Sequence, residues 1–152
     1  MTTEDQLAVV DGLLTRPFPS AEEQAVPAEG VWEGYRRSGP GYHMCYLQAS
    51  RDFWDDRSED VVEAAEEEIA AAFESLASAL TSRWGRPEKV DLVSYLEGEI
   101  EEVEPMGSVC QLTDRMFVWH PGQGRWVALA VGQPDREFPI VLLAAVGETS
   151  LL

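Results

Sequence analysis

Basic residues are scarce in this chain. Its 152 residues include 11 lysines and arginines against 28 aspartates and glutamates, which gives a formal net charge of −17. Nucleic acids and anionic membrane surfaces are bound through clusters of cations, so neither is an expected partner. A protein partner with a basic surface is compatible with this charge, which also favours solubility.

Cysteine and histidine are scarce as well, at two residues each. Cys45, Cys110, His43 and His120 show none of the close Cys–Cys or His–His spacings of a zinc site. We therefore expect no metal and no other cofactor. Two cysteines are too few for a disulfide scaffold, and buried thiols in a reducing compartment are the simpler interpretation.

The sequence has no apolar run of membrane-spanning length, and its first residues, MTTEDQLAVVDGLL, lack the basic start of a signal peptide. These two absences predict a soluble, cytoplasmic protein. A 45% content of hydrophobic residues and five tryptophans argue against a disordered chain. Its length fits one domain, residues 1–152.

Motifs that carry catalysis are also missing, including G-x-S-x-G, H-E-x-x-H and the EF-hand spacing. The glutamates of residues 97–104 lie in a stretch with glycine and proline but no histidine or lysine that would set different pKa values. We assign no catalytic residue and expect a protein that is not an enzyme.

What the sequence does contain is one long helical signal, residues 58–84. Its apolar residues recur at intervals of three and four, and they are Val62, Ala65, Ile69, Phe73, Leu76 and Leu80. Asp56 or Ser58 marks the start, and Gly85 followed by Pro87 marks the end. The helix also carries glutamates at i,i+4, which repel one another, so apolar packing must stabilise it.

The remaining chain predicts an α+β fold. A shorter helix is expected over residues 3–15 and a connecting loop over 16–30. The expected strands are 31–37, 42–49, 89–96, a stretch that begins at 109–112 and continues over 115–120, then 125–131 and 140–146. The last three form an antiparallel meander, with residues 121–124 as a four-residue hairpin loop. We predict an antiparallel sheet of four to six strands with both helices packed on it.

Residues 126–131 and 140–146 are apolar on both alternating faces. A sheet with one solvated face would alternate apolar and polar residues, so both faces must be covered. Helices on two sides or a second copy of the chain, as a homodimer, would each satisfy this pattern.

Two hypotheses for function follow. In the first, an acidic surface binds a basic protein partner. The favoured contact residues lie before and within the long helix, and they are Asp52, Phe53, Trp54, Asp55, Asp56, Glu63 and Glu67. Aromatic residues beside aspartates suggest a contact patch, because tryptophan and tyrosine are enriched at binding hot spots. Alternatively, Phe53 and Trp54 pack as a hydrophobic staple at the start of the helix.

In the second hypothesis, the chain binds a small molecule, or acts as a minor enzyme, through a pocket between helix and sheet. The expected lining residues of that pocket are Tyr42, Tyr46, Trp119 and Trp126.

Two segments, RWGRP at 83–87 and RWVALAVGQPDREFP at 125–139, resemble small acidic proteins of Streptomyces and related actinobacteria that have no assigned activity. The resemblance covers about residues 58–147. Its motifs are a helix end and a strand–turn–strand, so it implies a fold and no functional residue. Size, acidity and the helix-on-sheet pattern are also similar to those of toxin-immunity proteins and secretion chaperones, an analogy of class that does not fix function.

Overall fold

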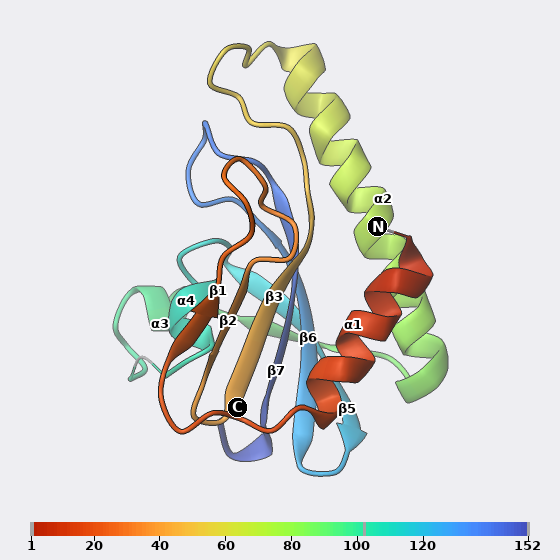
Figure 1. Cartoon of the computed structure of the whole chain (residues 1–152), viewed down its shortest axis with the longest axis vertical. Coiled ribbons are helices and arrows are strands. Elements are labelled where there is room, and N and C mark those ends of the chain that lie inside the picture. The colour runs from red at the N-terminus through yellow and green to blue at the C-terminus, as the bar shows by residue number, and fades with distance from the viewer. Residues whose placement is uncertain (1, 102, 152) are drawn as a thin grey trace.

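The chain folds into one antiparallel sheet with its two long helices packed against it (Figure 1). The computed structural model describes residues 2–101 and 103–151. Seven strands follow the order β1-β2-β3-β7-β6-β5-β4, and every neighbouring pair is antiparallel. The strands are β1 Glu23–Ala25, β2 Arg36–Gly39, β3 Tyr42–Ala49, β4 Glu88–Asp91, β5 Arg115–Gly122, β6 Arg125–Gly132 and β7 Val141–Glu148. The helices are α1 Thr3–Thr15, α2 Glu59–Trp84, the single turns α3 Val93–Leu96 and α4 Met106–Val109, and the 3-10 helix η1 Thr149–Leu151.

Both predicted long helices are confirmed. A reciprocal capping box starts α1, in which Thr2 and Asp5 each accept the backbone N–H of the other. At the end of α2, Gly85 adopts φ 86° and its N–H donates to the carbonyl of Thr81. Arg83 of α2 then pairs with Asp11 of α1 at 2.7 Å, which ties the two helices together.

The sheet has one strand more than the upper bound of the prediction. Residues 16–30, expected as a loop, contain the short edge strand β1, and β2 begins at Arg36 rather than Val31. Expected strand character at 93–96 and at 109–112 is wrong. The Asp91 carboxylate accepts the Val93 N–H and starts the turn α3, and hydrogen bonds such as Cys110 N–H to Met106 O close the turn α4.

The meander of β5, β6 and β7 is confirmed, with a tighter first turn than expected. Because β5 reaches Gly122, the loop is only Gln123 and Gly124, both at positive φ (62° and 75°), as in a two-residue hairpin. On the next pair of strands, Gly147 lies opposite Trp126. A Cβ atom at Gly147 would lie 2.3 Å from the Trp126 ring, so only glycine fits there.

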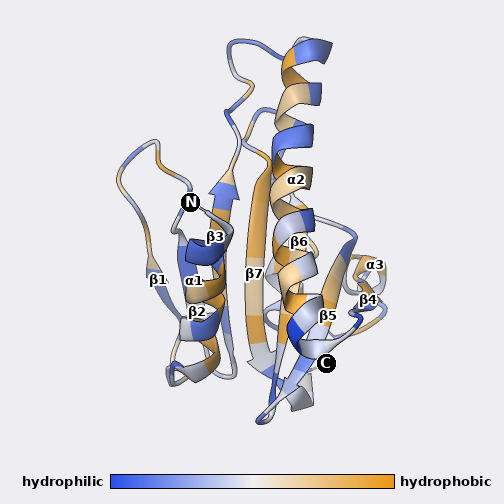
Figure 2. Ribbon diagram, turned by 90° about the vertical axis from the view of Figure 1, so that its right-hand side faces the viewer, coloured by the Kyte–Doolittle hydropathy of each residue, from blue (hydrophilic) through white to orange (hydrophobic). Residues whose placement is uncertain are grey.

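Both faces of the sheet are covered by the chain itself. One core cluster lies under α1 and α2 and includes Ile69, Leu76, Trp119 and Leu129. The second lies on the opposite face under α3, α4 and the segments around them, and includes Met106, Val118 and Leu143. Figure 2 shows the apolar central strands behind the two long helices. Of the two predicted covers, helices on two sides account for this burial, although those on the second face are single turns.

Candidate functional site

Three loops meet at one end of the sheet, residues 26–35, 50–58 and 133–139 (Figure 1). The first is tied to β3 by two hydrogen bonds, Gly34 N–H to Tyr46 O and Tyr46 N–H to Tyr35 O. The second is tied to the third by the Phe53 N–H, which donates to the carbonyl of Glu137 at 2.9 Å. These main-chain bonds hold segments that are far apart in sequence in one arrangement.

Aromatic rings gather where the loops meet. Phe138 lies between two tryptophans, with edge-to-face contacts to Trp32 at 5.4 Å and to Trp54 at 5.3 Å between ring centroids. Tyr35 contacts Tyr46 at 5.0 Å. Edge-to-face pairs are a favourable geometry for aromatic rings, so each loop contributes a ring to one ordered cluster.

Beside this cluster the surface is hollowed into a groove of about 650 Å³, which we call the aromatic groove. Its lining residues are Val26, Pro27, Ala28, Glu29, Gly30, Val31, Trp32, Tyr35, Tyr46, Asp52 and Trp54. Trp54 is 59% exposed and Val26 is 71% exposed. The lining combines four aromatic rings with two carboxylates, and it holds no lysine, arginine or histidine among the described residues.

The predicted partner-binding residues separate into three locations. Asp52 and Trp54 line the aromatic groove. Phe53 is 3% exposed and packs in the core cluster under the helices, whereas Trp54, which the staple interpretation paired with it, is 59% exposed. The remaining acidic residues, Asp55, Asp56, Glu63 and Glu67, are exposed on the following loop and on α2.

Asp56 has a structural role at the start of α2. Its carboxylate accepts the N–H of Ser58 at 2.9 Å, and hydrogen bonds from Ser58 lower its pKa. Ser58 itself, the N-cap residue, makes no side-chain capping bond.

The four predicted pocket residues do not share a pocket between helix and sheet. Trp119 lies on the α2 face of the sheet, whereas Tyr42, Tyr46 and Trp126 lie on the opposite face. Trp119 of β5 pairs with Val127 of β6, and successive residues of a strand point to opposite faces, so Trp119 and Trp126 lie on opposite faces of the sheet. The protein's own groups bind the polar atoms of three of them: Trp119 Nε1 donates to Thr81, Trp126 Nε1 to Glu148 O and Tyr42 to Glu22. Only Tyr46 lines the aromatic groove.

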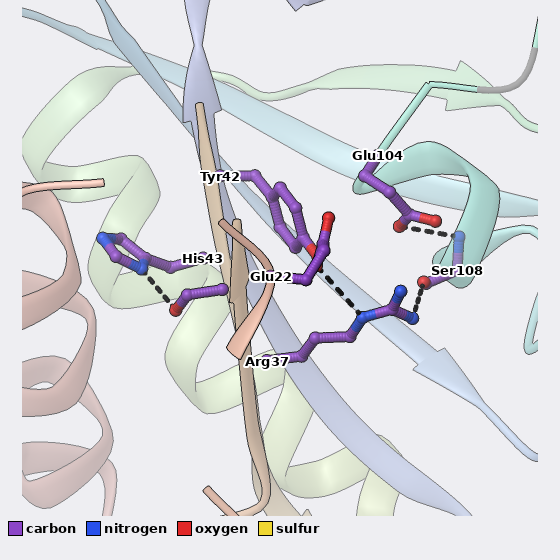
Figure 3. A network of polar contacts seen from close by, with 7 residues as sticks. Glu22, Arg37, Tyr42, His43, Glu104 and Ser108 are labelled. Carbon is purple, nitrogen blue, oxygen red and sulfur yellow. Dashed lines mark hydrogen bonds and ion pairs between the residues drawn. The ribbon is translucent and has the colours of Figure 1, made fainter. Parts of the chain in front are cut away.

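Figure 3 shows a polar network on the face of the sheet opposite α1 and α2. Arg37 lies at its centre, 3.6 Å from the Glu22 carboxylate, and donates to the Ser108 hydroxyl at 2.7 Å. Glu104 accepts the Ser108 N–H. The Tyr42 hydroxyl donates to Glu22, and burial together with this bond raises the pKa of Tyr42. The network joins the segment before β1 to α4 through β2 and therefore stabilises the fold.

A serine–histidine pair lies on the α1 side of the same strands. The Ser38 hydroxyl and His43 Nδ1 are 2.6 Å apart, and His43 Nε2 donates to the carbonyl of Arg16 at 3.1 Å. Burial lowers the pKa of His43, so the ring is neutral and Ser38 donates to it. His43 is completely buried, and both of its ring nitrogens are occupied. The pair fastens the residue after α1 to the sheet.

The described residues were also compared with the requirements of a reactive thiol, a metal site and a membrane-spanning helix. Burial raises the pKa of the Cys45 thiol to about 11, which removes it as a nucleophile near neutral pH. No group of three or more histidine, cysteine, aspartate or glutamate side chains is placed to hold a metal in residues 2–101 and 103–151. Among the helices of these residues, none is long and apolar enough to span a membrane.

Comparison of the chain with protein-family models, with curated proteins and with solved structures found no match.

Sequence reasoning identified only part of the groove. Asp52, Trp54 and Tyr46 were among the predicted residues, but they were assigned to two different sites. Phe138, which does not line the groove but contacts Trp32 and Trp54, was missed, because it follows Pro134 and Asp135 in a stretch that indicates only a turn. The available signal was the number of aromatic residues in predicted loops and in the short predicted strand 31–37, since Trp32, Tyr35 and Trp54 have no apolar periodicity that would bury them.

Proposed function

We propose that this protein is a non-enzymatic protein-binding protein whose contact surface is the aromatic groove. The exposure of apolar side chains carries the proposal. Five large hydrophobic side chains are exposed in the described residues, and three of them, Val26, Val31 and Trp54, line this groove. Apolar exposure that is concentrated in one place and rimmed by polar residues is typical of an interaction site.

Composition and rigidity support the same function. Tryptophan and tyrosine are the residues enriched at binding hot spots, because they bury a large area at a small cost in side-chain entropy. The loops that present them are held by hydrogen bonds to β3 and to each other, so little ordering is needed on binding. Glu29 and Asp52 make the rim acidic, in keeping with the net charge of −17.

The partner we propose presents a basic surface, because a negatively charged protein attracts it and steers its approach. A role of immunity or chaperone type, a cytoplasmic location and a relation to the small acidic proteins of Streptomyces are all compatible with this function. Each remains a proposal.

Photo-crosslinking in cells that express the protein natively tests this function. A photoreactive amino acid replaces Val31, which is exposed in the aromatic groove, and in a control variant it replaces Ala71, which is exposed on α2. A protein adduct is expected at position 31 and not at position 71. The captured protein is then identified, purified and titrated against the wild type and Trp54→Ala.

Because hot-spot truncations cost about 2 kcal/mol or more, Trp54→Ala should weaken binding by about thirtyfold. Adducts at position 71 alone, or equal affinities of the wild type and Trp54→Ala, would contradict the proposal.

A small-molecule-binding function is the second candidate, and the volume of the groove favours it. Ligand sites measure about 300–1,000 Å³, and 650 Å³ falls within that range. Native mass spectrometry of the protein from its own cells distinguishes the two functions. A bound small molecule that is lost with Trp54→Ala would select this candidate, and a bare chain would count against it.

A further inference from the structure

We propose that the aromatic groove accepts the guanidinium group of an arginine on the partner protein. This inference rests on the proposed function and specifies the chemistry of the contact.

The aromatic rings supply the first half of the recognition. Trp32, Tyr35, Tyr46 and Trp54 all line the groove. Ring faces carry partial negative charge and attract cations within about 6 Å, with tryptophan the strongest and arginine the most frequent partner. A planar guanidinium can also stack on a ring, whereas the compact and strongly hydrated ammonium of lysine cannot.

The carboxylates supply the second half. Asp52 and Glu29 line the groove beside the rings, and no described basic residue lines it to neutralise them. Among the described residues neither carboxylate forms an ion pair, and the neighbouring Arg51 Nε donates to the backbone carbonyl of Asp52 at 3.3 Å. A carboxylate next to an aromatic face matches both the charge and the donors of a guanidinium.

The same chemistry occurs inside this molecule. The Arg125 guanidinium lies 3.9 Å from the ring centroid of Phe18 and donates to the carbonyls of Leu13 and Arg16. There the cation rests on an aromatic face while oxygen acceptors bind its N–H groups. The groove offers a similar combination to a guanidinium from outside, with the exposed Trp54, the half-buried Trp32 and Tyr35, and the acidic residues Asp52 and Glu29.

Nuclear magnetic resonance with three short blocked peptides tests the inference. The peptides are identical except for a central arginine, citrulline or leucine. Citrulline keeps the shape of arginine but is neutral, so it isolates the contribution of charge. The indole N–H signals of Trp32 and Trp54 report binding in the groove, and that of the buried Trp126 serves as an internal control.

The arginine peptide should shift the Trp32 and Trp54 signals and leave Trp126 unchanged. The citrulline peptide should bind about tenfold more weakly, from the loss of cation–π and ion-pair attraction. Asp52→Asn should weaken the arginine peptide by about threefold or more and leave the citrulline peptide unaffected. Glu63→Gln, which removes an exposed charge on α2, should change the arginine affinity by less than about twofold.

Equal affinity of the arginine and citrulline peptides would overturn the inference, as would an arginine peptide that leaves the groove signals unchanged. A leucine peptide that shifts Trp32 and Trp54 more strongly than arginine would also overturn it, while leaving the proposed protein-binding function intact. The proposed function itself fails on a separate result, the absence of a protein adduct at position 31.

Discussion

Trp54 differs from Trp119 and Trp126 in the exposure of its side chain. Trp119 and Trp126 are 1% and 0% exposed and fill the two cores, whereas Trp54 is 59% exposed and its ring contacts that of Phe138 edge to face. A side chain in that position contributes little to folding. Its size and exposure therefore point to a contact with another molecule.

This difference predicts a separation of stability from binding. Trp54→Ala should lower the free energy of unfolding by less than about 1 kcal/mol, because little buried area is lost. Trp126→Ala should lower it by about 3–5 kcal/mol through loss of packing and the cavity that remains. Urea denaturation of both variants measures the contrast. A Trp54→Ala variant as unstable as Trp126→Ala would show that Trp54 belongs to the core.

His43 gives the molecule a pH dependence. Burial lowers its pKa, and the nearby charges of Arg125, Arg16 and Arg36 act in the same direction, opposed by the bond to the Arg16 carbonyl. The unfolded state therefore takes up a proton at a higher pH than the native state does. Stability is full above the unfolded pKa of about 6.5 and declines as the pH falls toward the native pKa.

Denaturation curves recorded between about pH 7 and about pH 5 should show this loss for the wild type. A His43→Gln variant, which can retain the bond to Arg16, should show a shallower decline. If the wild type and His43→Gln lose stability in parallel, groups other than His43 determine the pH dependence in this range.

At the scale of elements, α2 carries its apolar and acidic residues on different faces. Ala65, Ile69, Leu76 and Leu80 are buried, whereas Glu63 and Glu67 are exposed. The helix is stabilised by packing against the sheet and weakened by repulsion among its glutamates.

Opposite effects on stability are therefore expected on the two faces. Leu76→Ala should cost about 2–5 kcal/mol, and Glu63→Gln should stabilise the protein by about 0.5 kcal/mol through loss of two i,i+4 repulsions, with Glu59 and Glu67. Thermal denaturation of the two variants tests this. A destabilised Glu63→Gln would indicate an attractive role for that carboxylate.

The elements that could be predicted are those whose signal is local. α1 and α2 have apolar residues at helical intervals between clear start and stop signals, and β3 and the strands of the meander are largely apolar runs bounded by glycine and proline turns. The turns α3 and α4 have no such pattern: residues 93–96 are apolar enough for a strand, and the hydrogen bond from Val93 to Asp91 selects the helical turn. β1 was missed because its three residues are all exposed and form a strand only by pairing with β2.

The aromatic groove could not be predicted from local sequence patterns, because its residues come from segments that are far apart in the chain. It joins residues 26–35 with residues 52 and 54, next to Phe138, and only the strand order brings these segments together. The predicted pocket combined Trp119 with three aromatic residues that lie on the other face of the sheet. Aromatic content does not tell which face a strand side chain points to, because that depends on the register of the strands.

At the scale of the whole molecule, Arg37 of β2 connects two segments that lie outside the strands. It bridges Glu22, which precedes β1, and Ser108 of α4. Arg37→Leu should lower the free energy of unfolding by about 1–3 kcal/mol, since its partners lose charge-assisted bonds. Chemical denaturation provides the value, and Arg86→Leu, an exposed arginine beyond α2, is the control. Equal effects of the two variants would remove the bridging role.

The coverage of both sheet faces also bears on assembly. Because the chain buries its own apolar strands, a second copy is not required to cover them. Sedimentation equilibrium should give the monomer mass of 16.9 kDa. A dimer that dissociates with Trp54→Ala would instead make a second copy the occupant of the aromatic groove.

The central claim, that the aromatic groove is where this protein binds its partner, is tested most directly by hydrogen–deuterium exchange with and without the protein captured at position 31. We predict slower exchange in residues 26–35, 50–54 and 133–139, and unchanged exchange along the acidic first turns of α2. Protection confined to residues 59–68 or to the edge strands, with none in the three loops, would contradict it.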